Sequence, residues 1–207
     1  MATRIKICGI TRLEDALAAA QAGAHAIGLV FYPGSARYVV PATAAKIIRA
    51  LPPFITTVGL FVNATAAEVR AALSEAPVDL LQFHGDEAPE FCRQFERPYM
   101  KAVRMRRGID LLQYAQNYQD AKALLLDAYV EGLEGGSGVT FDWNLVPAKL
   151  AVPVILSGGL TAENVAEAVR RVRPLAVDVS SGVESAKGIK DASKIAAFMK
   201  GVHDADV

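Results

Sequence analysis

Hydrophobic and polar positions along the chain follow two patterns that recur in turn. Short apolar runs, many of them rich in β-branched residues, are each followed by an alanine-rich stretch whose apolar positions recur at helical spacing. Such repetition of a strand signal and a helix signal is typical of βα units around a parallel sheet. We expect eight strands, at RIKIC from Arg4, AIGLVF from Ala26, ITTVGLF from Ile55, DLLQF from Asp79, MKAVR from Met100, ALLLD from Ala123, PVILS from Pro153 and LAVDVS from Leu175.

Helix starts are marked after several of these runs. Apolar residues at helical spacing predict a helix over residues 13–20, and Thr11 with Glu14 is expected to form a capping box at its start. Thr65 with Glu68 repeats this signal before another alanine-rich stretch. Four further residues are predicted N-caps, namely Asp86, Asp142, Thr161 and Asp191.

Eight βα units in 207 residues predict an α/β protein of one domain, a single (β/α)8 TIM barrel spanning residues 1–207. A doubly wound open sheet is the alternative for a chain with this alternation. A dinucleotide-binding sheet of that kind carries a G-x-G-x-x-G fingerprint after its first strand, and this chain has none there. The barrel is therefore favoured.

Composition excludes several classes of function. The 22 Lys and Arg residues balance the 22 Asp and Glu residues, and no basic run is dense enough to follow a nucleic-acid backbone. The N-terminus lacks a long apolar segment, and no stretch approaches the roughly 20 apolar residues that span a bilayer. We therefore expect a cytoplasmic protein that binds neither nucleic acid nor membrane.

The chain has two cysteines, Cys8 and Cys92. In a cysteine-poor chain without an export signal, both are expected to be reduced thiols rather than a disulfide. Metal-ligand spacing is absent from the sequence, so no metal site is predicted.

In such a barrel the active site lies at the carboxyl ends of the strands, so the residues just after each apolar run are the candidates for function. The last two strands are followed by SGGL from Ser157 and SSGV from Ser180. Glycines let backbone N–H groups approach an anion closely, and this fold commonly binds phosphate with the loops after strands seven and eight. We therefore expect a phosphorylated substrate, with two ordinary glycine turns as the alternative.

Two residues at strand ends are candidates for proton transfer. Asp127 closes the apolar strand ALLLD, where partial desolvation favours the protonated form that a general acid requires. Its alternative is a solvated loop carboxylate or a helix cap. Cys8 ends the first strand, next to Gly9 and near a predicted helix start that would stabilise a thiolate base or nucleophile. From the residues alone, a small apolar core residue is the interpretation favoured for Cys8, and it is also the one preferred for Cys92.

Three loops carry further candidates. Arg37 lies in FYPGSARYV among aromatic and turn residues, where its guanidinium suits a planar carboxylate or an aromatic acid; a surface arginine over a tyrosine is the alternative. His84 is interpreted as a structural hydrogen-bond partner and is not among the predicted catalytic residues. The glycine-rich loop EGLEGGSG, residues 131–138, is expected to form a mobile lid that excludes water from the site.

Several motifs lie along the chain from Lys6 to the KGIKD segment near Asp191, namely KICGIT, FYPGSARYV, LFVN, LLQFHGDE, LLLDAY with GGSGVTFDW, SGGL and DVSSGVE. In this order and combination they resemble the phosphoribosylanthranilate isomerases. The resemblance implies a single (β/α)8 barrel that acts in tryptophan biosynthesis. The implied reaction is the Amadori rearrangement of N-(5′-phosphoribosyl)anthranilate, an aldose–ketose isomerisation that uses neither cofactor nor metal.

The resemblance also implies a role for each matching residue. Cys8 would be the general base, Asp127 the general acid, and Arg37 the group that holds the anthranilate carboxylate. Four residues would form the phosphate site, largely through backbone amides: Gly158, Gly159, Ser181 and Gly182. The ligand would be a phosphorylated small molecule, and the chain would act as a monomer or a homodimer.

Three other functions compete with this one. A sister isomerase of histidine biosynthesis performs the same rearrangement but uses an aspartate at the end of strand one, where this chain has Cys8. Barrels that epimerise ribulose phosphate need metal ligands, and of the three histidines only His84 follows a strand. A non-catalytic barrel that binds a phosphorylated metabolite is the third alternative, and the presence of both Cys8 and Asp127 favours the enzyme.

Overall fold

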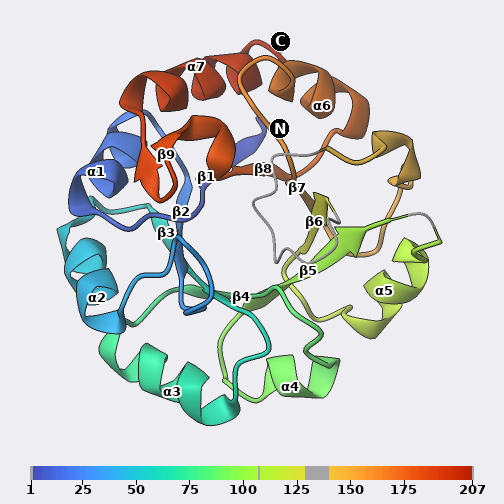
Figure 1. The fold of residues 1–207 in the computed structure, drawn as a ribbon. Helices are drawn as coiled ribbons and strands as arrows, with labels where there is room; N and C mark the ends of the chain where they lie inside the picture. The colour runs from blue at the N-terminus through green and yellow to red at the C-terminus, as the bar shows by residue number, and fades with distance from the viewer. Residues whose placement is uncertain (1, 107, 129–139, 207) are drawn as a thin grey trace.

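The computed structural model describes residues 2–106, 108–128 and 140–206 of the chain. Eight parallel strands pair in chain order and close into a barrel, with the helices arranged around it (Figure 1). The strands are β1 (Arg4–Ile7), β2 (Ala26–Val30), β3 (Thr56–Phe61), β4 (Leu80–Phe83), β5 (Tyr99–Met105), β6 (Leu124–Ala128), β7 (Val154–Leu156) and β8 (Ala176–Val179). All eight predicted strands and the (β/α)8 barrel are therefore confirmed, and the open sheet is excluded.

The helices follow the strands around the outside of the barrel (Figure 1). They are α1 (Leu13–Gln21), α2 (Pro41–Ala50), α3 (Ala66–Glu75), α4 (Pro89–Arg93), α5 (Leu111–Asn117), α6 (Val165–Val172) and α7 (Ala192–His203), with 3-10 turns η1 (Trp143–Leu145) and η2 (Ser181–Val183). A short antiparallel hairpin of β9 (Glu184–Ala186) and β10 (Ile189–Lys190) follows η2, and the sequence patterns did not predict it. No helix within the described residues is long and apolar enough to cross a membrane.

Several predicted helix starts are confirmed. Thr65 and Glu68 form the expected capping box at α3, each side chain bonding the other residue's backbone N–H. The Asp191 carboxylate accepts from the backbone N–H groups of Ser193 and Lys194 at the start of α7. The Asp142 carboxylate likewise accepts from the backbone of η1. Side chains that accept hydrogen bonds from the free backbone N–H groups of the first turn therefore fix where these helices begin.

Three predicted caps are wrong. Helix α1 begins at Leu13 behind Arg12, and the Thr11 hydroxyl instead donates to the carbonyl of Gly188 in the β9–β10 hairpin. Asp86 and Thr161 precede helices that start later, since the N-caps of α4 and α6 are Ala88 and Asn164. The hydroxyl of Thr11 finds a partner far away in the sequence, which a local cap signal cannot anticipate.

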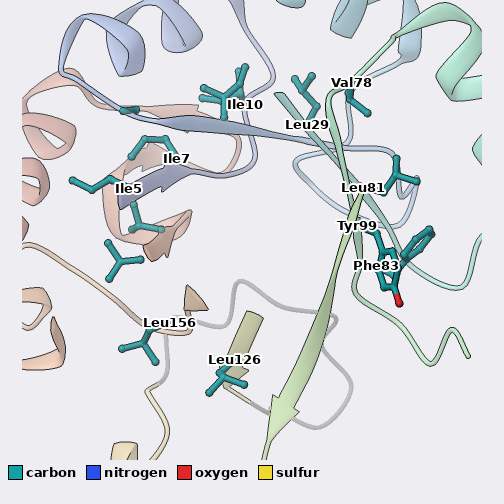
Figure 2. Close-up of a cluster of buried hydrophobic side chains, with 14 of the residues drawn as sticks. Ile5, Ile7, Ile10, Leu29, Val78, Leu81, Phe83, Tyr99, Leu126 and Leu156 are labelled. Carbon is teal, nitrogen blue, oxygen red and sulfur yellow. The ribbon is translucent and has the colours of Figure 1, made fainter. Parts of the chain in front are cut away.

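Alternation along the strands divides the buried side chains into two sets. Residues that point outward pack under the helices and form the larger core, which includes Ile5, Ile7, Leu29, Leu81, Phe83, Leu126 and Leu156 (Figure 2). Residues that point inward fill the barrel, and an apolar cluster of Val58, Met100, Ala102, Ala123, Leu125, Ile155 and Ala176 occupies part of that interior. The cluster makes this part of the barrel interior a packed core rather than a channel.

Candidate active site

A pocket opens at the carboxyl ends of the barrel strands. Six of the seven residues predicted for the site line it, namely Cys8, Arg37, Asp127, Gly158, Gly159 and Ser181. The seventh, Gly182, follows Ser181 and packs against the carbonyl of Leu160, a residue that also lines the pocket. Segments far apart in the sequence therefore meet here because parallel strands place all their carboxyl ends on the same side of the barrel.

The two sides of the pocket differ in chemistry. One side is apolar and is formed by a small cluster from the first three strands and the residues after them: Cys8, Val30, Leu60 and Val62, with Tyr32 packed against it. Much of the remaining lining is polar and includes Gln82, His84, Asp127, Ser157 and Asp178. A ligand with a flat apolar end and a hydroxylated end would match this division.

Cys8 lies on the apolar side, almost fully buried at 6% exposure. Burial raises the pKa of the Cys8 thiol, and the nearby Lys6 ammonium is the strongest influence in the opposite direction. Lys6 is itself buried, and its Nζ lies 2.8 Å from Oδ1 of Asp178. The cation acting on Cys8 is thus a side chain of the same strand, in addition to any effect of the helix start that was predicted to stabilise the thiolate.

Asp127 is held by the polar side of the pocket. Its Oδ1 accepts from the backbone N–H of Ala128 at 2.9 Å, and its Oδ2 lies 3.0 Å from Nε2 of His84. The other ring nitrogen of His84 lies 2.8 Å from the Gln82 amide. Both oxygens of the carboxylate are therefore oriented, and the negative charge that remains after proton donation has two hydrogen-bond partners.

His84 was predicted to be a structural hydrogen-bond partner, and its ring does bond Asp127. That it also lines the pocket was not predicted. Its position just after β4 gave a signal, because Gln82 and His84 are two residues apart and therefore point to the same inner face. What the sequence could not give was the neighbour across the barrel, since β4 and β6 are separated by β5.

Arg37 is fixed above Gly9. Its Nε and one terminal nitrogen donate to the two carboxylate oxygens of Glu184 at 2.8 and 2.9 Å, a bidentate pair that uses two of the five guanidinium N–H groups. The Lys190 ammonium binds the same carboxylate at 2.9 Å. A Cβ at Gly9 would lie 2.5 Å from Cδ of Arg37, so the glycine of KICGIT leaves the space that the arginine occupies. The unpredicted hairpin thus orients the predicted arginine.

The glycines after β7 and β8 are required by close packing. Gly158 has φ of +84°, and a Cβ there would lie 2.5 Å from the backbone nitrogen of Ala128 and 3.0 Å from Oδ1 of Asp127. Gly159 also has a positive φ, of +62°. A Cβ at Gly182 would lie 2.0 Å from the Leu160 carbonyl oxygen. The two loops therefore approach each other and the acid candidate at backbone distance, as an amide-lined anion site requires.

Two other predictions concern residues away from this geometry. Cys92 is fully buried on α4, as expected for a core cysteine, and burial raises its pKa to about 12. The predicted lid at residues 131–138 lies outside the described residues. Among the residues that the structure describes, no group of three or more His, Cys, Asp and Glu side chains is arranged to hold a metal ion.

Comparison with known proteins points to one family. A family model described as N-(5'phosphoribosyl)anthranilate (PRA) isomerase matches residues 5–201 of the chain. The N-(5'-phosphoribosyl)anthranilate isomerase of Nitrosospira multiformis is 60% identical over 202 residues, which make up 98% of this chain and 97% of that protein. The sequence relationship thus extends over almost the whole barrel.

Solved structures agree with the sequence matches. The crystal structure of phosphoribosyl anthranilate isomerase from Thermotoga maritima has a TM-score of 0.89 and 42% identity, covering 98% of this chain and 99% of that one. A second structure has a TM-score of 0.87, 41% identity and the same coverage, and is described as this isomerase in complex with reduced 1-(o-carboxyphenylamino)-1-deoxyribulose 5-phosphate. Both proteins share the barrel and nearly their full length with this chain.

Proposed function

The chain belongs to the N-(5′-phosphoribosyl)anthranilate isomerase family, and on this premise we propose that it performs the Amadori rearrangement of tryptophan biosynthesis with Asp127 as general acid and Cys8 as general base. The substrate would be N-(5-phosphoribosyl)anthranilate and the product 1-(2-carboxyphenylamino)-1-deoxyribulose 5-phosphate. The observation that carries the proposal is the placement of Cys8 and Asp127 in one pocket, on its apolar and its polar side. A sugar between them would be reached by an acid on one side and a base on the other.

Ring opening is the first step. Asp127 donates its proton to the furanose ring oxygen, the bond between that oxygen and C1′ breaks, and the nitrogen lone pair forms a Schiff base at C1′. The carboxylate left behind keeps hydrogen bonds from the Ala128 backbone and, with its Nε2 protonated, from His84. These partners stabilise the charge at the moment when the proton has left, which is when stabilisation lowers the barrier.

Proton removal at C2′ is the second step. The Cys8 thiolate takes this proton, and the electron pair moves through C1′ to the nitrogen, giving an enolamine. Tautomerisation of the enolamine to the ketone completes the isomerisation, so no atom is gained or lost overall. Each positioned acid or base typically contributes about 10²- to 10⁴-fold to the rate.

Recognition of the two ends of the substrate fits the division of the pocket. Val30, Leu60, Val62 and Tyr32 supply the apolar surface for the anthranilate ring. Arg37 would hold the anthranilate carboxylate with the guanidinium N–H groups that Glu184 leaves free. The phosphate would bind at the backbone amides of the two glycine loops. A related isomerase is described in complex with a carboxyphenylamino sugar phosphate, which supports a ligand that has these two ends.

The test is turnover of phosphoribosylanthranilate generated in the cuvette, followed by the loss of substrate fluorescence. We expect wild type to be active, and Cys8→Ala and Asp127→Asn each to lose about 10²- to 10⁴-fold in kcat with unchanged folded-state spectra. Cys92→Ala is the matched control, because Cys92 lies in the core away from the pocket, and it should retain wild-type turnover.

Two results would contradict the proposal. If wild type binds a product analogue without turning over substrate, the chain is a binding protein rather than an isomerase. If Cys8→Ala or Asp127→Asn retains turnover within a few-fold of wild type, that residue is not the proposed base or acid.

A further inference from the structure

Lys6 of β1 lies in the barrel interior, close to Cys8, which follows the strand. The two residues are two positions apart, and alternation along a strand points both side chains inward. Lys6 is 3% exposed, and the pairing of β1 with β8 places it opposite Asp178. A lysine is rarely buried to this extent without a specific partner, because its charge loses the solvation of water.

Gly28, on the neighbouring strand β2, provides the space in which the ends of these two side chains come together. A Cβ at this position would lie 2.6 Å from Sγ of Cys8 and 3.1 Å from Nζ of Lys6. Gly28 is not among the residues with positive φ, so its backbone does not demand glycine. Space is the reason for a glycine here, and the thiol and the ammonium share that space.

We propose that Lys6 is a positioning residue of the isomerase, the buried cation that stabilises the thiolate form of Cys8 and so makes this cysteine a base. This inference rests on the proposed function, in which Cys8 removes the C2′ proton. A thiolate in a buried pocket has little water to solvate its charge, so a fixed ammonium beside it replaces that solvation.

Asp178 competes with Cys8 for the charge of Lys6. Its Oδ1 lies 2.8 Å from Nζ, and the hydroxyl of Ser157 donates to its other oxygen at 3.3 Å. The carboxylate keeps Lys6 protonated, but its own negative charge disfavours a second anion at Cys8. Asp178 and Lys6 therefore act on Cys8 in opposite senses: the carboxylate disfavours the thiolate and the ammonium favours it.

Two other cations act on Cys8, and both share one carboxylate partner. Lys190 on β10 and Arg37 after β2 both act on Cys8, and both bind the carboxylate of Glu184 on β9. Their positive charges are thus partly offset by a carboxylate next to them. Lys6 is the influence that most favours the thiolate, against the burial that raises the pKa of Cys8.

The experiment measures the rate of alkylation of Cys8 by iodoacetamide as a function of pH, in protein without substrate. Cys92→Ala serves as the background, so that Cys8 is the one thiol of the chain. The midpoint of the rate profile reports the pKa of Cys8, because the thiolate is the reactive form.

Two variants, compared with each other, isolate the influence of Lys6. Asp178→Asn removes the competing carboxylate and leaves the thiolate of Cys8 as the anion that pairs with Lys6, so the midpoint should fall below that of wild type. Lys6→Met combined with Asp178→Asn removes both charges, which avoids an unpaired buried carboxylate, and the midpoint should rise by about one to three pH units above that of Asp178→Asn. Spectra and unfolding curves establish that each variant is folded.

Equal midpoints in the two variants would overturn the inference, since a purely structural lysine would leave the thiol unchanged. The measurement needs no turnover, so it is independent of the identity of the base. If the alkylation midpoints shift as expected but the acid limb of the turnover profile does not follow them in the same variants, Lys6 acts on the thiol as inferred and the role of Cys8 as base is wrong.

Discussion

Two buried lysine–carboxylate pairs lie close to the barrel wall and are put to different uses. The inner pair, Lys6 with Asp178, points into the barrel. The outer pair, Lys101 with Glu87, lies on the opposite face of the wall, because Lys101 alternates with the inward residues Met100 and Ala102 of β5. The alternation of side chains along a strand thus separates the pair that borders the pocket from the pair that packs beneath the helices.

The outer pair is closed, by which we mean that its charged atoms are hydrogen-bonded to the backbone as well as to each other. Lys101 Nζ binds the carbonyls of Phe83 and Gly85 and the carboxylate of Glu87 at 3.3, 2.5 and 3.1 Å. The same carboxylate accepts from the backbone of Gly85 at 2.9 Å and of Asn63 at 2.8 Å. This network joins the loops after β3 and β4 and fixes the backbone on both sides of His84. A saturated buried pair of this kind serves structure.

The inner pair is open, by which we mean that it borders the pocket and its charged atoms have fewer hydrogen bonds, among the residues that the structure describes, than those of the outer pair. Lys6 has one carboxylate partner and the thiol of Cys8, and Asp178 lines the pocket. Charges with unused capacity beside a pocket can respond to a change of protonation or to a ligand, whereas charges saturated by the backbone cannot. The comparison indicates that buried charge is associated with chemistry only where it borders space that a ligand enters.

The largest effect is expected from breaking the outer pair. Lys101→Met leaves the Glu87 carboxylate buried without its cation and two carbonyls without their donor, so the free energy of unfolding should fall by about 3–5 kcal/mol. Denaturant unfolding measures it, with Lys46→Met at an exposed position of α2 as control. The alkylation midpoint of Cys8 should stay at its wild-type value. A loss below about 1 kcal/mol, or a shifted midpoint, would contradict the division into a closed and an open pair.

The two cysteines sharpen the comparison, because each lies near one pair. Cys92 is fully buried near Lys101, and burial raises its pKa to about 12, whereas Cys8 borders the pocket beside Lys6. Burial raises the pKa of both thiols, so the difference between them rests on access to the reagent. Cys8 lines the pocket and Cys92 is enclosed in the core, so folded protein should be alkylated at Cys8 at least about tenfold faster than at Cys92. Mass spectrometry of peptides gives both rates. Similar rates in folded protein would show that the reagent reaches Cys92 as easily as Cys8. Denatured protein is the control, and both residues should be alkylated in it.

The smallest effect is expected from filling space on either face of the wall. Gly28→Ala places a methyl group against Cys8 and Lys6, while Gly59→Ala on β3 places one 3.0 Å from a side-chain carbon of Val78 under the helices. Overpacking should cost each variant about 1–3 kcal/mol in unfolding free energy. Turnover and the Cys8 alkylation profile should change in Gly28→Ala alone. Equal changes in both variants would indicate a general loosening of the barrel rather than a specific contact at Gly28.

The periodic signals were the most reliable guide to the fold. All eight strands were predicted because a buried parallel strand is an apolar run whatever surrounds it. Thr65 and Asp191 were predicted as caps because their partners lie within three residues. Thr11 was predicted wrongly because its partner, Gly188, lies at the other end of the chain. Success therefore followed the sequence distance between interacting groups.

The sequence distance between interacting groups also decided which features of the candidate site could be predicted. The sequence by itself placed Cys8, Asp127 and the glycine loops at strand ends, since strand ends are local features and the barrel brings them together. It did not indicate that His84 contacts Asp127. That contact depends on which inward side chains of β4 and β6 lie at the same height in the barrel.

Local patterns in this sequence determined the elements, their order and the residue types at the mouth of the barrel, because helix and strand periods are properties of a few consecutive residues. Only the tertiary structure decided which charges meet. The β1–β8 register set Lys6 beside Asp178, and the β9–β10 hairpin brought Glu184 to Arg37, 147 residues away in the chain. The physical reason is that barrel closure and hairpin docking minimise the exposed apolar surface of the whole chain, and the polar contacts inside follow from that global fit.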